Sequence, residues 1–484
     1  MRKNDDFSKH PQSKFEISNR NVTENLIQSQ EDQTFYDKII DSCGLNKSIL
    51  KIYIIAILFV IADGGEMIVI SLITTKLGEE WALSELQKGF LGSSIFIGYF
   101  IGAIFSGKIS DNKGRKPILR TSSIIFTIFA FLSSFSTGFY SFLFFRSLCG
   151  FGIGLSIPAL VTLLSEISPS QHRSMMINCL WLFFPIGEVI VIVIAKFFIM
   201  SPGGWRYVLI FTSVACFIAI ILTFYIFESP KFLICNDRLE EGFDILNEMI
   251  SHNSQPFKLK ENEKKVIALE LKEAEMNTIN SDFKELITEK YLRLSVLVSL
   301  IFFFVCYIYY GLLYVLPQIM LVVANEKNKE DKFDFDQIYA GLIWSAISEI
   351  PGNIVAAWLA NSETYGRKYS MAIGFGVTGV FMLFALINIE NINFFASIIK
   401  FSISLPFNII YLYTVEAYPT KIRSIALGAS SAFARIGGII TPFLSQLFFA
   451  WNYKLPLLFY FFNSIFGVLC CLHLPFDTRT RTIH

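Results

Sequence analysis

Twelve apolar runs follow one another along this chain, and they constrain its fold more than any other feature. A helix needs about 20 mainly apolar residues to cross the roughly 30 Å hydrocarbon core of a bilayer. The sequence therefore predicts an all-α membrane protein with twelve transmembrane helices. The expected spans are 49–75, 89–107, 117–136, 139–163, 177–200, 207–227, 292–323, 338–360, 369–388, 393–414, 424–449 and 455–475.

The composition supports a lipid environment. Hydrophobic residues make up 53% of the chain and charged residues 17%, whereas a soluble domain carries about 25% charged residues. The lipid bilayer is thus an expected partner, and a soluble enzyme is excluded. The net charge of +1 gives no electrostatic basis for binding nucleic acid. The chain has no Walker loop for a nucleotide and no metal-ligand spacing among its eight cysteines, so we expect no cofactor and no metal.

Charge and hydropathy divide the chain into five parts. Residues 1–47 and 228–293 hold 39 of the 81 charged residues. We expect a solvated N-terminal tail with a short helix near Phe35–Ile40, and a linker with amphipathic helices, as around Phe243 and Ile250. Lys and Arg gather in the 2–3, 8–9 and 10–11 loops, which places both termini and the linker in the cytoplasm. The expected parts are a tail at 1–48, a six-helix bundle at 49–227, a linker at 228–290, a second six-helix bundle at 291–475 and a tail at 476–484.

An internal repeat relates the two expected bundles. Residues 165–174 (SEISPSQHRS) and 415–424 (VEAYPTKIRS) repeat Glu, Pro, Arg and Ser in register, at an offset of 250 residues. Gly114–Arg115 matches Gly366–Arg367 at nearly the same offset. Two six-helix halves in the same orientation explain this repeat, and halves with a site between them are a transporter architecture.

Several motifs resemble those of the major facilitator superfamily. GKISDNKGRK at 107–116 matches its Gly-x-x-x-Asp-x-x-Gly-Arg-Lys/Arg loop, and RSLCGFGIG at 146–154 is similar to its Arg-x-x-x-Gly-x-Gly motif. The resemblance implies two pseudo-symmetric six-helix bundles that work by alternating access. Within the superfamily, the sequence resembles the synaptic vesicle 2-related branch, together with the organic cation and anion transporters. The segments that carry this closer resemblance are ADGGEMIVIS at 62–71, YYG at 309–311, SEIPG at 348–352, YTVEAYPTKIRS at 413–424 and FARIGGIITPF at 433–443.

Sugar porters are the nearest alternative within the superfamily. They share the Glu-Ser-Pro element that occurs here in FESPKFL at 227–233. They usually carry a Gln-Gln-x-x-Gly cluster in helix seven, whereas the seventh run contains CYIYYGLLYVLPQIM at 306–320, with one Gln. A hydroxyl-rich ligand needs polar amide donors, so this departure argues against a hexose substrate.

Two acids in the first span are candidates for the substrate or ion pathway. A charge at the bilayer centre costs about 2.5–3.5 kcal/mol on insertion scales, so such residues mark function. Asp63 and Glu66 lie three residues apart on one helix face. Gly64 and Gly65 between them allow a ligand or a helix to come close. Two acids in apolar surroundings suit a proton carrier or a cation site; the alternative is a structural pair buried against a basic residue.

Four further charged residues fall within spans. Glu188 and Glu349 lie near span centres, where they line a pathway or make helix–helix hydrogen bonds when protonated. Arg146 and Lys400 occupy matching places in the two halves. The resemblance associates this arginine with proton coupling or anion attraction, and the alternative is that both basic residues brace their own half. Lys400 can also face Glu349 or Asp63.

Aromatic residues of the seventh span complete the expected pathway. Tyr310 and Tyr314, four apart on one helix face, can stack on a cation or a ring. Most other aromatic residues are expected to face lipid.

The resemblance also implies two charge networks that close the inner ends of the bundles. Gly107 lets helices approach, and Asp111 and Arg115 form a latch in which Asp111 engages the N-terminal end of the eleventh span. Arg115 holds the inner acids of its own half. Both contacts are expected only when the inner face is closed, and the alternative is that these charges set topology alone. The expected gating residues are Gly107, Asp111, Gly114, Arg115, Glu166, Arg173, Glu228, Glu363, Arg367, Glu416, Arg423, Arg435 and Asp477.

The sequence thus predicts a secondary active transporter of a small organic solute, charged and coupled to protons, that works as a monomer. It would lie in the plasma membrane or in an intracellular vesicle membrane. One alternative is a facilitator of sugars or other neutral solutes. Another is a membrane protein that transports nothing and serves as a receptor or assembly subunit; the intact loop at 107–116 argues against it.

Overall fold

The computed structural model describes residues 34–252, 259–279, 283–327 and 335–478. Within these ranges, twelve helical segments are long and apolar enough to cross a membrane, which confirms the predicted all-α membrane fold. They are α3 (Lys47–Glu80), α4 (Glu85–Lys113), α5 (Arg115–Ser133), α6 (Phe139–Ile167), the joined α7 (Ser170–Leu180), η1 (Trp181–Phe183) and α8 (Phe184–Phe198), α9 (Gly204–Thr223), α13 (Glu289–Lys327), the pair α14 (Phe335–Ile347) and α15 (Glu349–Asn361), α16 (Gly366–Ile387), α17 (Ile392–Ala417) after η3 (Ile389–Asn391), α18 (Thr420–Trp451) and α19 (Leu455–His473).

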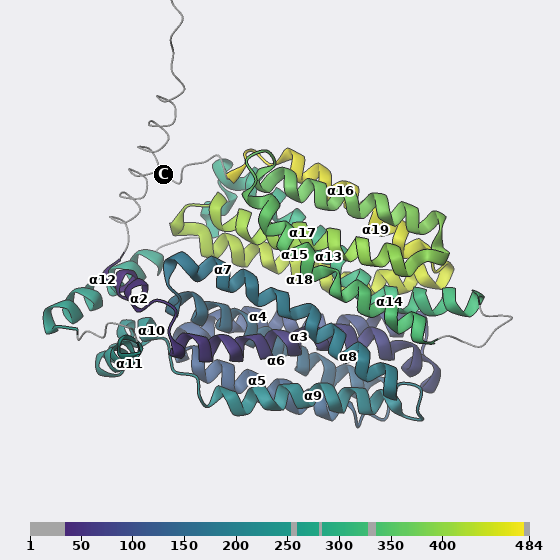
Figure 1. The fold of residues 1–484 in the computed structure, drawn as a ribbon, viewed down its shortest axis with the longest axis horizontal. Coiled ribbons are helices and arrows are strands. Elements are labelled where there is room, and N and C mark those ends of the chain that lie inside the picture. Colours follow the sequence, from purple (N-terminus) through teal and green to yellow (C-terminus); the bar gives the residue numbers. More distant parts are fainter. Residues whose placement is uncertain (1–33, 253–258, 280–282, 328–334, 479–484) are drawn as a thin grey trace, which may run out of the picture.

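The spans form two layers that face each other (Figure 1). Helices α3–α9 make the N-terminal bundle, in purple to teal, and α13–α19 make the C-terminal bundle, in green to yellow. Four short helices, α2 (Phe35–Cys43), α10 (Pro230–Cys235), α11 (Leu239–Ser251) and α12 (Glu261–Ile279), gather at one end of the N-terminal bundle, at the left of Figure 1. We call this end of the molecule the linker side and the other end the opposite side.

Glycines hold helices α4 and α6 in close contact. A methyl group at Gly98 would lie 1.8 Å from the Ser147 carbonyl oxygen, and one at Gly154 would lie 2.2 Å from that of Tyr99. Gly102 and Gly150 are similarly close to backbone oxygens of the facing helix. Small residues spaced four apart let membrane helices pack backbone to backbone, so these positions fix the interior of the N-terminal bundle.

The eighth span is interrupted beside an acid. Helix α14 ends at Ile347 and α15 begins at Glu349, with Ser348 between them. Pro351 has no N–H to donate to the carbonyl of residue 347, so the helical bonding is broken at this point. The break positions Glu349 in the first turn of a new helix.

The short helices on the linker side are more buried than expected. The predicted helix near Phe35–Ile40 is present as α2, but it is not solvated: Tyr36 is 2% exposed, and its hydroxyl donates to the Glu166 carbonyl oxygen at 3.0 Å. Residues 1–33 of the predicted tail lie outside the described residues. In the linker, α11 buries Phe243 and Ile250, as its amphipathic pattern predicts.

Candidate functional site

A cavity lies where the two bundles meet, and residues of both bundles line it. Asp63 of α3 reaches it from the N-terminal bundle, while Glu349 of α15 and Arg435 of α18 reach it from the C-terminal bundle. Most of the remaining wall is aromatic. The aromatic lining residues are Tyr99, Trp181, Phe184, Tyr309, Tyr310, Phe407 and Tyr411.

Asp63 and Arg435 carry the unbridged charges of this cavity. Asp63 is 3% exposed, and its Oδ1 atom is buried without a hydrogen-bond partner. The Arg435 guanidinium lies over the Tyr99 ring, 3.9 Å from its centre. Within the described part of the chain, Arg435 makes no ion pair with a carboxylate. The sequence predicts Arg435 as a gating residue at the start of the eleventh span; α18 begins at Thr420, so residue 435 lies about 22 Å along the helix and lines the central cavity.

Some of the other polar groups of the cavity have partners within the protein. The Tyr309 hydroxyl donates to Glu349 Oε2 at 2.7 Å. Asn408 Nδ2 donates to Asn353 Oδ1 at 2.6 Å and to the Ser404 carbonyl oxygen at 2.9 Å. These amides were not among the predicted site residues, although polar amides inside apolar runs were a signal that could have identified them.

Glu66 differs from Asp63 because it is paired with a basic residue. Its Oε2 atom lies 2.6 Å from Arg146 Nη1, and the two side chains are 1% and 0% exposed. Both belong to the N-terminal bundle, on α3 and α6. The two acids of the first span therefore have different environments: Glu66 is paired inside one bundle, and Asp63 faces the cavity between bundles. Gly64 fits the expected close approach, since a methyl group there would lie 2.2 Å from the Phe184 carbonyl oxygen.

Lys400 joins the two bundles through a buried triad. Its Nζ atom lies 3.1 Å from Glu188 Oε2, on α8 of the N-terminal bundle. It also forms an ion pair with Glu349, on α15 of its own bundle, and lies 5.0 Å from the centre of the Tyr309 ring. All three members of the triad are at most 3% exposed. Sequence reasoning left open that Lys400 faces Glu349, but it did not foresee Glu188 as the second partner.

The two predicted tyrosines, Tyr310 and Tyr314, lie at different depths between the bundles. Tyr310 lines the central cavity, where its ring packs against Phe96 with centres 4.7 Å apart. Tyr314 does not line it. Its hydroxyl donates to the Lys88 carbonyl oxygen at 2.6 Å, and its own carbonyl accepts from Ser71 at 2.6 Å. Tyr314 therefore connects the bundles toward the opposite side.

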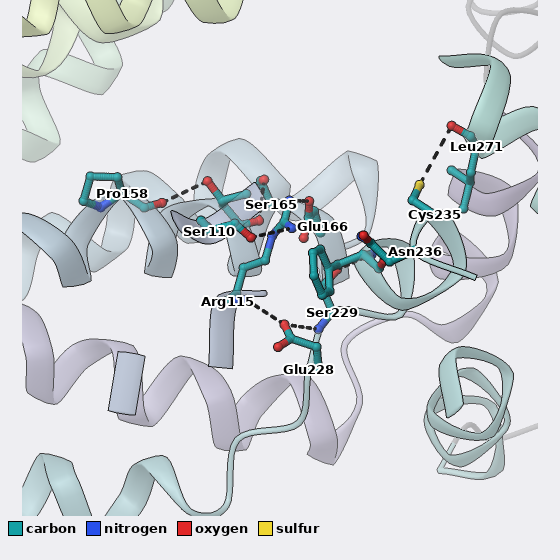
Figure 2. A network of polar contacts seen from close by, with 12 residues as sticks. Ser110, Arg115, Pro158, Ser165, Glu166, Glu228, Ser229, Cys235, Asn236 and Leu271 are labelled. Carbon is teal, nitrogen blue, oxygen red and sulfur yellow. Dashed lines mark hydrogen bonds and ion pairs between the residues drawn. The ribbon is translucent and has the colours of Figure 1, made fainter. Parts of the chain in front are cut away.

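The charge clusters on the linker side lie within the bundles rather than between them. In the N-terminal bundle, Arg115 Nη2 lies 2.7 Å from Glu166 Oε1, and the Arg115 backbone N–H donates to Glu228 at 2.9 Å (Figure 2). In the C-terminal bundle, Arg367 Nη2 lies 3.0 Å from Glu416 Oε1, and its backbone N–H donates to Asp477 at 3.2 Å. The sequence repeat thus corresponds to matching contacts in the two bundles.

Glycines complete both clusters. Gly114 and Gly366 have φ angles of 94° and 63°, a region that favours glycine. A methyl group at either position would lie less than 2.5 Å from a carboxylate oxygen of Glu228 or Asp477. These glycines let each acid approach the backbone N–H groups that open the following helix.

Three other expected gating residues lie outside these clusters. Arg173 pairs with Asp37 of α2 at 3.0 Å. Arg423 is half-buried, with its Nε atom buried and without a hydrogen-bond partner. Glu363 is exposed on the linker side.

The bundles are joined in the middle and toward the opposite side. Among the described residues, no hydrogen bond or ion pair joins them at the linker side. There, Asp111 is exposed, and added methyl groups at Gly107 or Gly428 would meet nothing within 4 Å. Among the described residues, the hydrogen bonds and ion pairs that join the bundles beyond the triad are Ser71 with Tyr314, Lys88 with Tyr314, Ser93 with Ile439, Glu85 with Gln446 and Lys196 with Asp336.

The latch expectation needs one correction. We expected the contacts of Arg115 only when the linker side is closed. They are present here while Asp111 is exposed, because Arg115 and its partners Glu166 and Glu228 all belong to one bundle. Contacts within a rigid body do not report how two bodies are arranged.

Comparisons with known proteins agree with this fold. A family model described as "Sugar (and other) transporter" matches residues 21–483. Synaptic vesicle 2-related protein of Bos taurus is 29% identical over 474 residues, covering 95% of this chain and 84% of that protein. The niacin transporter NiaP of Acinetobacter baylyi is 27% identical over 376 residues, covering 77% of this chain and 81% of that protein. The xylose transporter XylE of E. coli, in a partially occluded inward-open conformation, has a TM-score of 0.72 at 17% identity, covering 90% of this chain and 99% of that one.

Proposed function

The chain belongs to the sugar (and other) transporter family of the major facilitator superfamily, and from that premise we propose that it moves a small organic ion across a membrane, coupled to protons. The observation that carries this proposal is the cavity between the bundles, which receives Asp63 from one bundle and Arg435 and Glu349 from the other. Ionisable side chains inside a membrane domain are costly and mark substrate or ion paths.

The contact pattern supports alternating access. The bundles are joined in the middle and toward the opposite side, and the described residues show no hydrogen bond or ion pair between them at the linker side, so the central cavity would communicate with that side. Loop charges assign that side to the cytoplasm. Transport requires the reverse arrangement as well, in which the Lys400–Glu188 contact opens and Asp111 meets the first turn of α18.

Buried acids support proton coupling. Asp63, Glu66, Glu188 and Glu349 are each at most 3% exposed. Glu66 sits in a rigid pair with Arg146, but Asp63 has an oxygen without a partner, and the triad has two acids for one lysine. Each of these places can take up one proton in one state and release it in the other.

The relatives support an organic ion over a sugar. The name of one relative specifies niacin, whose ring nitrogen and carboxylate are both ionisable. A sugar facilitator remains the second candidate, because the family description and the XylE likeness include sugars. The cavity disfavours it, since a neutral solute would leave the charges of Asp63 and Arg435 without a partner.

The test is uptake into vesicles reconstituted with the purified protein. We expect an acid-outside gradient to drive uptake of an organic ion from a panel of organic cations, organic anions and sugars. Asp63→Asn should abolish gradient-driven uptake without lowering the amount of folded protein. Arg206→Gln, which removes a surface charge paired with Glu80, is the matched control. Uptake of a sugar at a rate independent of pH would overturn the proposal in favour of the facilitator.

A further inference from the structure

The polar groups that remain without a charged partner in the central cavity define the solute it can hold. Resting on the proposed transport function, we propose that this cavity selects a small planar aromatic solute that carries one carboxylate and one ring nitrogen. The carboxylate would meet Arg435, the nitrogen would meet Asp63, and the ring would lie between the aromatic walls.

The polar groups that line the cavity differ in whether they already have partners. Glu349 is held by Tyr309 and Lys400, and both donors of the Asn408 amide are used. The Tyr310 and Tyr411 hydroxyls and the Trp181 indole N–H also line the cavity and make no hydrogen bond among the described residues, so neutral groups remain for a solute as well. Two charged side chains keep capacity: Asp63, through its buried Oδ1, and Arg435, through a guanidinium without a carboxylate partner among the described residues.

The two free groups have opposite signs and come from opposite bundles. A guanidinium binds a carboxylate through two parallel hydrogen bonds, which fixes the plane of that group. Asp63 Oδ1 can share one proton with a ring nitrogen, whichever of the two atoms holds it. A solute with both groups would thus bind α3 and α18 together, whereas a solute with one group would leave a buried charge unmatched.

The walls specify the body of the solute. Tyr309 and Phe407 pack with ring centres 4.9 Å apart, and Phe184 lies 6.3 Å from Tyr309. Such surfaces favour a flat π-system in offset or edge-on contact. Together, the walls and the two charges match a pyridine carboxylate better than an alkyl ammonium ion or a sugar.

The charge balance of the cavity agrees with a solute that has no net charge of its own and binds together with one proton. The cavity and the triad contain three acids, Asp63, Glu188 and Glu349, and two bases, Lys400 and Arg435. At their ordinary charges they sum to −1. One proton neutralises the set when the solute binds as a zwitterion, and two protons do so when it binds as a carboxylate anion, so a dianion or a dication would be disfavoured.

The experiment uses the full chain in reconstituted vesicles with labelled nicotinate (pyridine-3-carboxylate) as the probe. Unlabelled nicotinate should compete at least tenfold better than benzoate, which lacks the nitrogen, and than nicotinamide, which lacks the carboxylate. Xylose should not compete. Arg435→Gln should remove the preference for nicotinate over nicotinamide, and Arg435→Lys should keep part of it. Asp63→Asn should remove the preference for nicotinate over benzoate.

Binding measured without transport separates the two proposals. Stabilisation of the detergent-solubilised protein against heat by nicotinate, absent in Arg435→Gln and retained in Arg206→Gln, supports the solute class even if no gradient drives uptake; in that case the transport proposal fails alone. Gradient-driven uptake of another organic ion, with neither binding nor uptake of nicotinate, overturns the solute class and leaves transport standing. Equal competition by nicotinate, benzoate and nicotinamide in the unmodified protein also overturns it.

Discussion

At their linker-side ends, the two bundles carry the same contacts: Arg115 with Glu166 in one, and Arg367 with Glu416 in the other. At their centres the bundles differ. Arg146 pairs with Glu66 inside the N-terminal bundle, whereas Lys400, in the matching place, reaches across to Glu188. The repeat has thus been kept where each bundle must be rigid and changed where the bundles meet.

This difference separates two mechanical roles. A pair inside a rigid bundle survives any rocking motion, so Glu66–Arg146 can persist in every conformation. A pair between bundles must break when they separate, so Lys400–Glu188 biases the equilibrium toward the arrangement in which it exists. The central charges of the two halves should therefore respond differently to the same kind of substitution.

The largest effect should come from Lys400→Gln. This change leaves Glu188 and Glu349 buried near each other without a positive charge, and removing one partner of a buried ion pair costs about 3–5 kcal/mol. We expect transport to be lost and the thermal unfolding temperature to fall. Uptake and heat-induced unfolding in detergent measure both. Lys400→Arg is the control that keeps the charge, and an unaltered Lys400→Gln protein would mean that the triad is not an ionic contact.

The second-largest effect is expected from Glu188→Gln, and Glu66→Gln is the variant to compare it with. The first weakens a contact between bundles, and a loss of 1.4 kcal/mol would shift the conformational population tenfold toward opening of the opposite side. The second weakens a contact inside one bundle and should leave that population unchanged. Alkylation of single cysteines at Gly107 on the linker side and at Ser71 toward the opposite side measures the balance, with the eight native cysteines replaced. Equal shifts in both variants would remove the distinction between the two centres.

The parts of this picture that could be predicted from the sequence are the local ones. Hydropathy determines the twelve spans, and Pro351 explains the break beside Glu349, because both depend on neighbouring residues. The Lys400–Glu188 contact joins residues 212 apart, on two helices that only the packing of the bundles brings together. The spacing of three residues placed Asp63 and Glu66 on one helix face. It could not show that Arg146 pairs with Glu66 and not with Asp63.

A smaller effect is expected at the linker-side ends, from Asp111→Asn. Asp111 is exposed here, so its neutralisation should not alter this arrangement. In the reverse arrangement it would lie near the N-terminus of α18, where a carboxylate gains about 0.3–1 kcal/mol. We expect the linker-side-open population to rise by about two- to fivefold and turnover to fall, with solute binding retained. Lys113→Gln, in the same exposed turn, is the control. Reduced transport without a change in cysteine accessibility on either side would contradict the latch.

The smallest effect concerns α2, which only the N-terminal bundle carries. Asp37 of α2 pairs with Arg173, and partly exposed pairs contribute roughly 0.2–1 kcal/mol. Cys43 at the end of α2 is 3% exposed, and burial raises its pKa to about 11. Below that pH the docked thiol is protonated and unreactive, whereas an exposed cysteine titrates near pH 8.5.

Asp37→Asn should therefore increase the alkylation rate of Cys43 at pH 8 by up to about fivefold, the limit set by a 1 kcal/mol contact. The increase should steepen between pH 8 and 9, since the released thiol forms thiolate in this range and the docked thiol does not. Asp244→Asn, on α11, is a matched control that removes an acid elsewhere on the linker side. If Asp37→Asn left the rate unchanged, the ion pair would not hold α2, and its docking would rest on its other contacts, which include the Ser170–Asp41 hydrogen bond and the buried side chains of Tyr36 and Ile40.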